Sequence, residues 1–213
     1  MRLNGGHLQY PLGVHKSTIK PGKKGKWKID RFTLTESQIG LDNLRNIRDG
    51  FPELCVAPGE YTRLVRVKNS HNVVVMSDTR MEALTNKPCI SAAKGRVLVH
   101  GLGMGFLLEN ILRKPEVSYV RVIEIDPDLI TLVKPHFKVD ILADRLEIIE
   151  DNALERRPEP NEKYDLVWHD IWDGLSSDNL AQMSTLQRRW ARRCETQMCW
   201  ARHLSLRSKR LYG

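Results

Sequence analysis

Residues 96–112, RVLVHGLGMGFLLENIL, constrain the fold more than any other part of the chain. An apolar run is followed by glycines at three alternate positions, Gly101, Gly103 and Gly105, and then by a helical pattern. Glycine permits positive φ angles and lets a ligand approach the backbone closely. The start of a helix adds free N–H groups and partial positive charge. The segment therefore predicts a strand, a tight turn and a helix, with the turn suited to a carboxylate, a phosphate or a nucleotide edge.

The spacing of these glycines does not match the fingerprint of dinucleotide-binding proteins. A dinucleotide fingerprint, G-x-G-x-x-G, requires a glycine at position 106 when it begins at Gly101. That position is Phe106, and the observed pattern is G-x-G-x-G. A tight turn without a ligand would also explain such a pattern taken alone, so its neighbours decide its meaning.

Strands and helices alternate after residue 95. Apolar β-rich runs lie at 96–101, 119–126, 145–151 and 164–170, and the helical patterns FLLENILRK and PDLITLVKPHF separate the first three of them. Such alternation predicts parallel βαβ units. In a sheet of this kind, ligands bind beyond the carboxyl ends of the strands.

Polar residues follow the predicted strands at this edge. Glu124 lies 23 residues after Gly101 and can accept hydrogen bonds from both ribose hydroxyls. Asp126 can contribute to the same site or cap the helix that begins at Pro127. The next two strand ends carry Asp151, Asn152, Asp170 and Asp173. Together these positions predict a cofactor-binding edge.

The sequence suggests four regions. We expect a basic N-terminal arm at 1–31, a small helix and β-hairpin module at 32–95, a cofactor-binding core at 96–176, and a long basic C-terminal helix and tail at 177–213. The module contains two β-rich runs around KNSH, which predict a hairpin, and a helix broken by Pro88. Apolar residues at steps of three and four predict one amphipathic helix over about 178–205.

Charge is distributed unevenly along the chain. The formal net charge is +8, with 34 Lys and Arg against 26 Asp and Glu. Residues 1–31 and 186–213 each hold eight basic residues and one acid, which leaves the middle net acidic. The basic ends can contact nucleic acid or another polyanion, form solvated surfaces, or pair with the acidic body.

The remaining composition gives negative expectations. The four cysteines form no C-x-x-C pair, so we expect free thiols and no structural metal. No apolar run approaches the length of a membrane span, and the N-terminus has no secretory h-region. We therefore expect a cytoplasmic protein.

Taken together, residues 96–173 resemble the nucleotide-binding half of the class I S-adenosylmethionine (SAM)-dependent methyltransferase fold. The matching pieces GLGMG, VIEIDPDLI, EDNALE and YDLVWHD most resemble the spermidine synthase-like branch. This resemblance implies a Rossmann-like α/β fold with a mostly parallel sheet, an N-terminal β-hairpin extension, and a core shortened after the fourth strand.

The resemblance also implies roles for individual residues. The three glycines would pack on the methionine part of SAM, and Glu124 would hold the ribose. Asp151, with Asn152, would face the adenine. Asp170 would be the catalytic or substrate-orienting acid, with Asp173 as the second candidate. Outside these motifs, we expect Asp78 and Trp172 to reach the substrate.

This chain departs from the spermidine synthase pattern at two places that bear on the reaction. Spermidine synthases carry an acid inside the glycine turn, where this chain has Met104, and their acid-rich stretch after the fourth strand is here IWDG at 171–174. Both differences disfavour aminopropyl transfer. The D/N-P-P-Y/F turn of DNA amino-methyltransferases is absent as well.

Three functions follow as hypotheses. The first is a SAM-dependent methyltransferase acting on a small-molecule or otherwise unknown acceptor. The second is an aminopropyltransferase that uses decarboxylated SAM. The third is a non-catalytic protein of this fold that binds nucleic acid or a protein through its basic ends. A homodimer that covers an edge strand is a further expectation.

Overall fold

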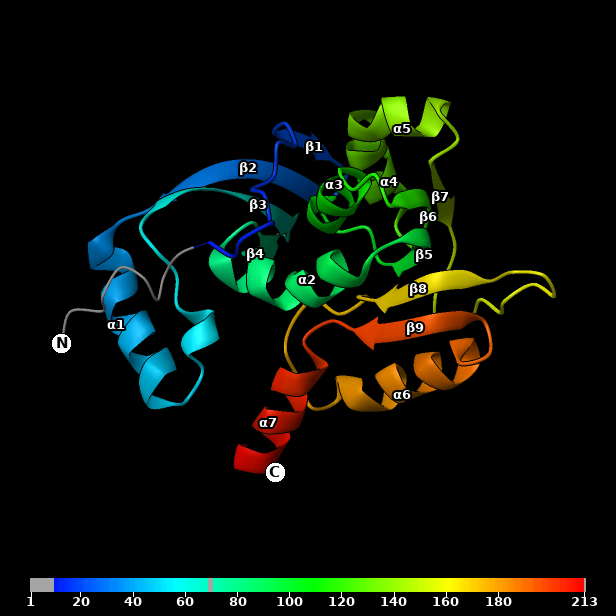
Figure 1. The fold of residues 1–213 in the computed structure, drawn as a ribbon. Coiled ribbons are helices and arrows are strands. Elements are labelled where there is room, and N and C mark those ends of the chain that lie inside the picture. The colour runs from blue at the N-terminus through cyan, green and yellow to red at the C-terminus, as the bar shows by residue number, and fades with distance from the viewer. Residues whose placement is uncertain (1–9, 69–70, 213) are drawn as a thin grey trace.

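The computed structural model describes residues 10–68 and 71–212 and contains two β-sheets joined through helices (Figure 1). A four-stranded sheet, ordered β1-β2-β3-β4, precedes a five-stranded sheet, ordered β7-β6-β5-β8-β9. The strands are β1 Gly22–Lys24, β2 Trp27–Leu34, β3 Gly59–Val67, β4 Asn72–Ser77, β5 Gly95–His100, β6 Val117–Glu124, β7 Leu146–Glu150, β8 Tyr164–His169 and β9 Cys194–Cys199. The helices are α1 Glu36–Arg48, η2 Pro52–Leu54, α2 Arg80–Ala92, α3 Phe106–Leu112, α4 Pro127–Val133, η3 Lys134–Phe137, α5 Lys138–Leu142, α6 Asn179–Trp190 and α7 Arg202–Tyr212.

The five-stranded sheet is parallel throughout. β5 lies at its centre and pairs with β6 on one side and β8 on the other. The chain therefore winds first toward β7 and then toward β9, which makes the β5–β8 boundary the point where strand order reverses. Ligands of doubly wound sheets bind beyond the strand ends at this reversal. The predicted Rossmann-like α/β fold is confirmed.

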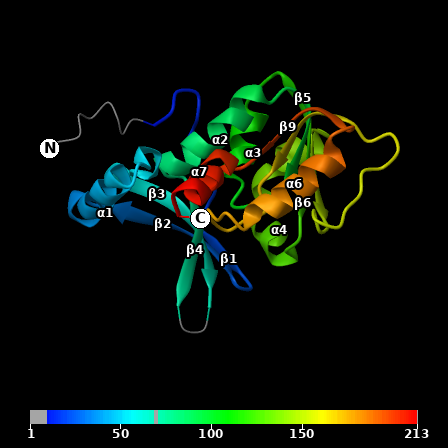
Figure 2. The same cartoon turned by 90° about the horizontal axis from the view of Figure 1, so that it is seen from below.

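The two faces of this sheet are covered unequally. Alternate residues such as Val97 and Val99 point to one face and pack with residues of α2, α3 and α4. Leu98 and Val167 point to the other face, where they pack with the buried Trp190 of α6. Leu204 of α7 packs with the first group, and Figure 2 shows α6 and α7 from below.

The N-terminal sheet is antiparallel and includes more of the chain than expected. The predicted hairpin is present as β3 and β4, and Figure 2 shows it projecting from the body. The predicted arm at 1–31 is wrong as a separate region. Its described part includes β1 and the start of β2, which pairs with β3 from Trp27↔Arg66 to Leu34↔Gly59. The lysine-rich composition concealed this strand, because pairing with β3 outweighs the weak local preference.

The C-terminal region also corrects the sequence analysis. A single helix over 178–205 is wrong, because α6 ends at Trp190 and β9 follows at Cys194–Cys199. β9 adds a fifth parallel strand beside β8, so the sheet continues beyond the fourth strand. Apolar residues at 194, 198 and 199 fit a helical spacing as well as a short strand, and the open edge of β8 decides between them.

Two smaller observations complete the fold. α2 runs through Pro88 instead of breaking there, and its residues Ala83, Cys89 and Ile90 are buried in the core on both sides of the proline. Tertiary packing holds the helix where local preference would end it. Among the described residues, no helix has both the length and the apolar character needed to cross a membrane.

Candidate functional site

A cavity of about 740 Å³ lies at the carboxyl ends of the central strands. Its lining comes from the tips of β5, β6, β7 and β8, from α2, and from the N-terminal sheet. The predicted cofactor, catalytic and substrate positions that line it are Gly101, Gly103, Glu124, Asp126, Asp151, Asn152, Asp170, Trp172 and Asp173. The cavity thus brings together most of the residues selected from the sequence.

The glycine turn lies against backbone and core side chains as well as the cavity. All three glycines have positive φ. A Cβ atom at Gly101 would lie 1.9 Å from the carbonyl oxygen of Asp170, so the β5 and β8 tips could not approach each other with any larger residue there. Gly103 lines the cavity, whereas Gly105 begins α3 and contacts Phe137 away from the cavity lining.

Glu124 is held rigidly at the end of β6. It is buried, and its two carboxylate oxygens accept hydrogen bonds from the backbone N–H groups of Leu102 and Asp126, each at 2.9 Å. Burial raises the pKa of this carboxyl, while these backbone hydrogen bonds act in the opposite direction. The side chain therefore links the glycine turn to the next strand and presents acceptor oxygens to the cavity.

Asp126 performs the capping role that was one of its two predicted functions. Its carboxylate accepts from the N–H groups of Asp128 and Leu129 at the start of α4. The ammonium of Lys26 lies 2.7 Å from its other oxygen. Burial opposes ionisation of Asp126, but the hydrogen bond from Lys26 helps to outweigh it and the pKa is lowered. This ion pair joins the N-terminal sheet to the rim of the cavity.

Asp151 and Asn152 begin the loop that follows β7. One oxygen of Asp151 accepts from Arg156 Nη1 at 3.1 Å, and the other accepts from the Asn152 N–H at 2.7 Å. The amide oxygen of Asn152 accepts from the Leu154 N–H at 3.0 Å. Both residues line the cavity, and these hydrogen bonds hold the backbone at the start of the loop.

Asp170 shares the deepest part of the site with a residue that sequence analysis did not identify. Glu82 of α2 is 3% exposed, lines the same cavity, and accepts a hydrogen bond from Asn86 Nδ2 at 2.7 Å. Burial raises the pKa of Asp170 to about 7. Burial and then the charge of Asp170 raise the pKa of Glu82 to about 8. The two carboxyls thus hold protons more tightly near neutral pH than exposed carboxyls would.

Asp173 and Trp172 lie nearer the cavity entrance. Asp173 is half exposed and forms an ion pair with Arg66 of β3, whose guanidinium stacks on Trp27. The indole N–H of Trp172 donates to Gln182 at 2.8 Å. Asp173 therefore connects the loop after β8 to the N-terminal sheet. This role differs from that of Asp170, whose carboxyl faces the cavity.

Asp78 does not line the cavity. It is 1% exposed, and its carboxylate accepts from the backbone N–H groups of Ser17 and Thr62 at 3.0 and 2.6 Å. These bonds tie the N-terminal segment to β3. The structure thus gives Asp78 a structural position, and the expected substrate contact is not supported.

Two histidines lie directly behind the strand tips. His100 and His169 precede Gly101 and Asp170, are fully buried, and approach each other at 2.8 Å between their Nδ1 atoms. Burial lowers the pKa of His169 to about 4 and that of His100 well below its usual value. Both rings are therefore neutral near pH 7 and act as a hydrogen-bonded support on the α6 side of the sheet.

Sequence analysis missed the residues that come from outside the core. The N-terminal sheet contributes Trp27, Arg66 and Met76 to the cavity wall, and α2 contributes Glu82 and Asn86. The only signal in the sequence that could have identified Glu82 and Asn86 was their spacing of four residues, which places two polar side chains on one face of α2. No spacing rule connects that pair to strand ends so far along the chain.

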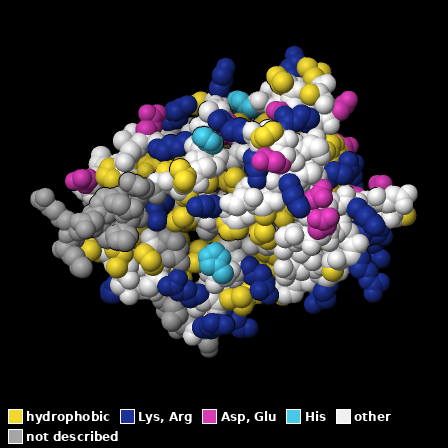
Figure 3. All heavy atoms as spheres, viewed as in Figure 1, with side chains coloured by type: hydrophobic (Ala, Val, Ile, Leu, Met, Phe, Trp, Pro, Cys, Tyr) yellow, Lys and Arg dark blue, Asp and Glu magenta, His cyan; other side chains and the backbone are white. Residues whose placement is uncertain are grey.

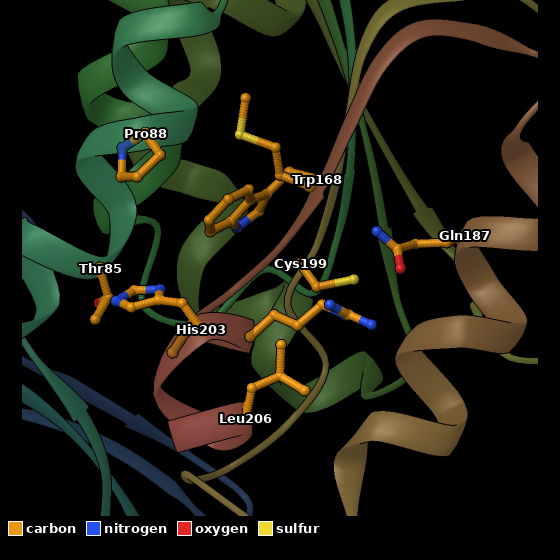
Figure 4. A pocket seen from close by; sticks show the side chains of 10 residues that line it. Thr85, Pro88, Trp168, Gln187, Cys199, His203 and Leu206 are labelled. Carbon is orange, nitrogen blue, oxygen red and sulfur yellow. The ribbon is translucent and has the colours of Figure 1, made fainter. Parts of the chain in front are cut away.

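A second cavity of about 320 Å³ lies between α2, β9 and α7 (Figure 4). Figure 4 shows Trp168 and Cys199 from neighbouring strands facing it, with His203 and Leu206 from α7. None of the described residues that line it is acidic. It therefore offers no carboxylate for a ribose, and the larger cavity remains the candidate site.

Comparison with known proteins gives similarity over part of the chain. No family model matches. Polyamine aminopropyltransferase 2 of Hyperthermus butylicus is 28% identical over 96 residues, which cover 43% of this chain and 32% of that protein. The expected resemblance to the spermidine synthase-like branch is confirmed as a sequence similarity, limited to about a third of that relative's length.

Two solved structures are similar to part of this chain. The methyltransferase PaMTH1 of Podospora anserina, solved with S-adenosylhomocysteine (SAH) bound, is 19% identical over 54% of this chain and 49% of its own, with a TM-score of 0.41. The 23S rRNA methyltransferase ErmE is 18% identical over 61% of this chain and 50% of its own, with a TM-score of 0.44.

Proposed function

We propose that this chain binds SAM in the larger cavity and transfers its methyl group to an acceptor that enters beside Asp170. The observation that carries this proposal is the convergence of a glycine turn, the buried carboxylate of Glu124 and a polar loop at the strand reversal. Sequence similarity to an aminopropyltransferase and structural similarity to methyltransferases are consistent with it.

The residues present fit such a cofactor. Glu124 offers carboxylate oxygens to ribose hydroxyls, and Asp151 offers acceptors to an exocyclic amino group. Gly101 and Gly103 leave the backbone free of Cβ atoms at the cavity wall. SAM supplies an electrophilic methyl group on a sulfonium, so the protein needs chiefly to position the acceptor.

The acceptor end is acidic and buried. Asp170 and Glu82 provide two carboxyls with raised pKa values, and a carboxylate poised near neutral pH is suited to accept a proton. We propose that Asp170 orients a proton-bearing nucleophile and takes its proton, while Glu82 adjusts the charge of the pair. Asp173 has a weaker claim to catalysis because Arg66 neutralises it.

Calorimetric titration with SAM, SAH and decarboxylated SAM tests the cofactor assignment. We expect SAM and SAH to bind wild-type protein, and decarboxylated SAM to bind less well. Incubation with methyl-labelled SAM and pooled small-molecule, RNA and protein acceptors then identifies the substrate class. If none of the three ligands binds, the cavity does not hold this cofactor and the proposal fails.

Aminopropyl transfer is the second candidate, and the match to Polyamine aminopropyltransferase 2 favours it. The glycine turn argues against it, because Met104 stands where that branch has an acid and its side chain is fully buried in the core. Tighter binding of decarboxylated SAM than of SAM would support this candidate over methyl transfer.

Partner binding through the basic ends is a separate proposal. Figure 3 shows Lys and Arg side chains spread over the visible face with acids between them. Several basic residues near the ends have internal partners, including Lys26 with Asp126 and Arg193 with the Pro160 carbonyl. We propose that any nucleic-acid contact is weak, and that a homodimer would form along the edge strand β9. Salt-dependent binding to labelled RNA and sedimentation analysis test these two points.

A further inference from the structure

The loop after β7 lines the cavity but has no regular secondary structure of its own. Asp151, Asn152, Ala153 and Leu154 all contribute to the cavity lining. Within the loop, the N–H groups of Glu155 and Arg156 donate to the Asn152 carbonyl at 2.9 and 2.8 Å. These local bonds form one turn, and they leave the carbonyl groups of the following residues in need of donors.

Arg189 of α6 supplies those donors from outside the loop. Its Nη1 atom donates to the carbonyl oxygens of Ala153, Leu154 and Arg156, and the first and third of these distances are 3.2 and 3.1 Å. The partners are 33 to 36 residues away in sequence. Arg189 precedes Trp190, which is fully buried against the sheet. The guanidinium is therefore anchored to the core and holds the loop backbone in one place.

A second arginine continues this contact toward the cavity. Arg156, whose carbonyl binds Arg189, directs its own side chain back to Asp151, with Nη1 3.1 Å from Oδ2. Its Nη2 lies 3.5 Å from Glu162, a carboxylate that is 4% exposed. Arg189, Arg156 and Asp151 thus form a connected chain from helix α6 to the cavity wall.

We infer that Arg189 is a positioning residue that sets the selectivity of the cofactor site for adenine over other purines. It does so by fixing the loop from which Asp151 faces the cavity. This inference rests on the proposed function. The carboxylate of Asp151 can only accept hydrogen bonds, so it favours the amino group of adenine and disfavours the carbonyl oxygen of hypoxanthine. That preference depends on a fixed carboxylate, because a mobile loop lets the oxygen move away from an unfavourable neighbour.

The experiment compares two ligands that differ only at this edge of the base. SAH and S-inosylhomocysteine are titrated into wild-type protein, Arg189→Met, Arg189→Lys and the control Arg192→Gln. Arg192 lies three residues beyond Arg189 and is exposed. We expect wild type and the control to prefer SAH clearly. In Arg189→Met, SAH affinity should decrease about tenfold or more while S-inosylhomocysteine affinity changes little, because one charged hydrogen-bond donor is worth at least about 1.4 kcal/mol.

The ratio of SAH affinity to S-inosylhomocysteine affinity distinguishes a positioning role of Arg189 from a general loss of protein stability. If Arg189→Met loses both ligands equally, or keeps the wild-type ratio, the inference is wrong. Arg189→Lys keeps a positive charge with fewer donors and should give an intermediate ratio, and it decides the question if Arg189→Met does not fold. If wild-type protein binds neither ligand, the proposed function itself fails and the inference fails with it.

Discussion

The two halves of the cavity treat their carboxylates differently. On the β6 and β7 side, Glu124, Asp126 and Asp151 each accept hydrogen bonds from backbone N–H groups, and Asp126 and Asp151 also pair with basic side chains. On the β8 side, Glu82 is buried, Asp170 lines the same cavity, and desolvation raises both pKa values.

The difference indicates which half is preorganised for a fixed ligand. Carboxylates held by backbone N–H donors keep their geometry before any ligand binds, which suits an invariant cofactor. Glu82 accepts from the side-chain amide of Asn86, and burial still raises its pKa and that of Asp170. Such carboxyls gain most when a further hydrogen-bond donor or a cation arrives. Under the proposed function, the cofactor half would be complete in the protein alone, whereas the acceptor half would be completed by its substrate.

The strongest test of the cofactor half is Glu124→Ala. We expect SAH affinity to decrease about a hundredfold or more, because the ribose loses its acceptor and two backbone N–H groups lose their partner. Glu150→Gln is the matched control, since Glu150 pairs with Glu124 in the strand register and is exposed. Calorimetry measures both variants, and equal affinity in the two would remove Glu124 from the site.

Two glycine substitutions should differ in effect although both lie in one turn. Gly101→Ala places a Cβ against the backbone carbonyl of Asp170, whereas Gly103→Ala meets the flexible side chain of Met76 with its sulfur at 2.5 Å. Backbone cannot move as easily as a methionine side chain. We expect Gly101→Ala to lower the melting temperature and SAH affinity more than Gly103→Ala does, as measured by thermal unfolding and calorimetry. The reverse order would contradict the close approach of β5 and β8.

The acceptor half predicts a separation of binding from turnover. In Asp170→Asn we expect SAH affinity within about threefold of wild type, because the carboxylates assigned to the cofactor are unchanged. Once an acceptor is known, methyl transfer should decrease about 10²- to 10⁴-fold, the usual contribution of a positioned proton acceptor. Asp173→Asn is the comparison variant and should lose less. A catalytic defect confined to Asp173→Asn would exchange their roles.

The smallest effect concerns the pH dependence of stability. Burial raises the pKa of Glu82 to about 8 in the folded protein, while an unfolded chain has about 4.3. Between those values the folded state holds a proton that the unfolded state has released, so stability decreases as pH rises and levels off above about 8. Glu82→Gln removes this titration.

Thermal unfolding of both proteins between about pH 5 and 8 measures the difference. We expect the melting temperature of Glu82→Gln to fall less with rising pH than that of the wild type. The difference should be about 2–4 °C for each kcal/mol by which the titration of Glu82 lowers the free energy of unfolding. Asp170 still titrates in the variant, so part of the slope remains. Parallel curves for the two proteins would show that Glu82 is not protonated in the folded state.

The sequence alone was sufficient for the central βαβ units and for most of one side of the site. Gly101, Glu124 and Asp151 could be placed together because parallel strands end at one edge and because glycine and acid residues have few local reasons to follow buried strands. Local patterns have little ambiguity there: each strand is short and apolar, and the first two are followed by recognisable helix starts, such as Asp126 before Pro127.

Tertiary structure decided everything that depends on contacts between distant segments. β9 is a strand because β8 offers it an open edge, and β2 is a strand because β3 pairs with it despite its lysines. Glu82 enters the site because α2 packs beneath the strand tips, and Arg189 reaches the loop after β7 because α6 packs on the opposite face. The physical reason is the same in each case: pairing and burial free energies between remote segments exceed the small local preferences that a sequence pattern records.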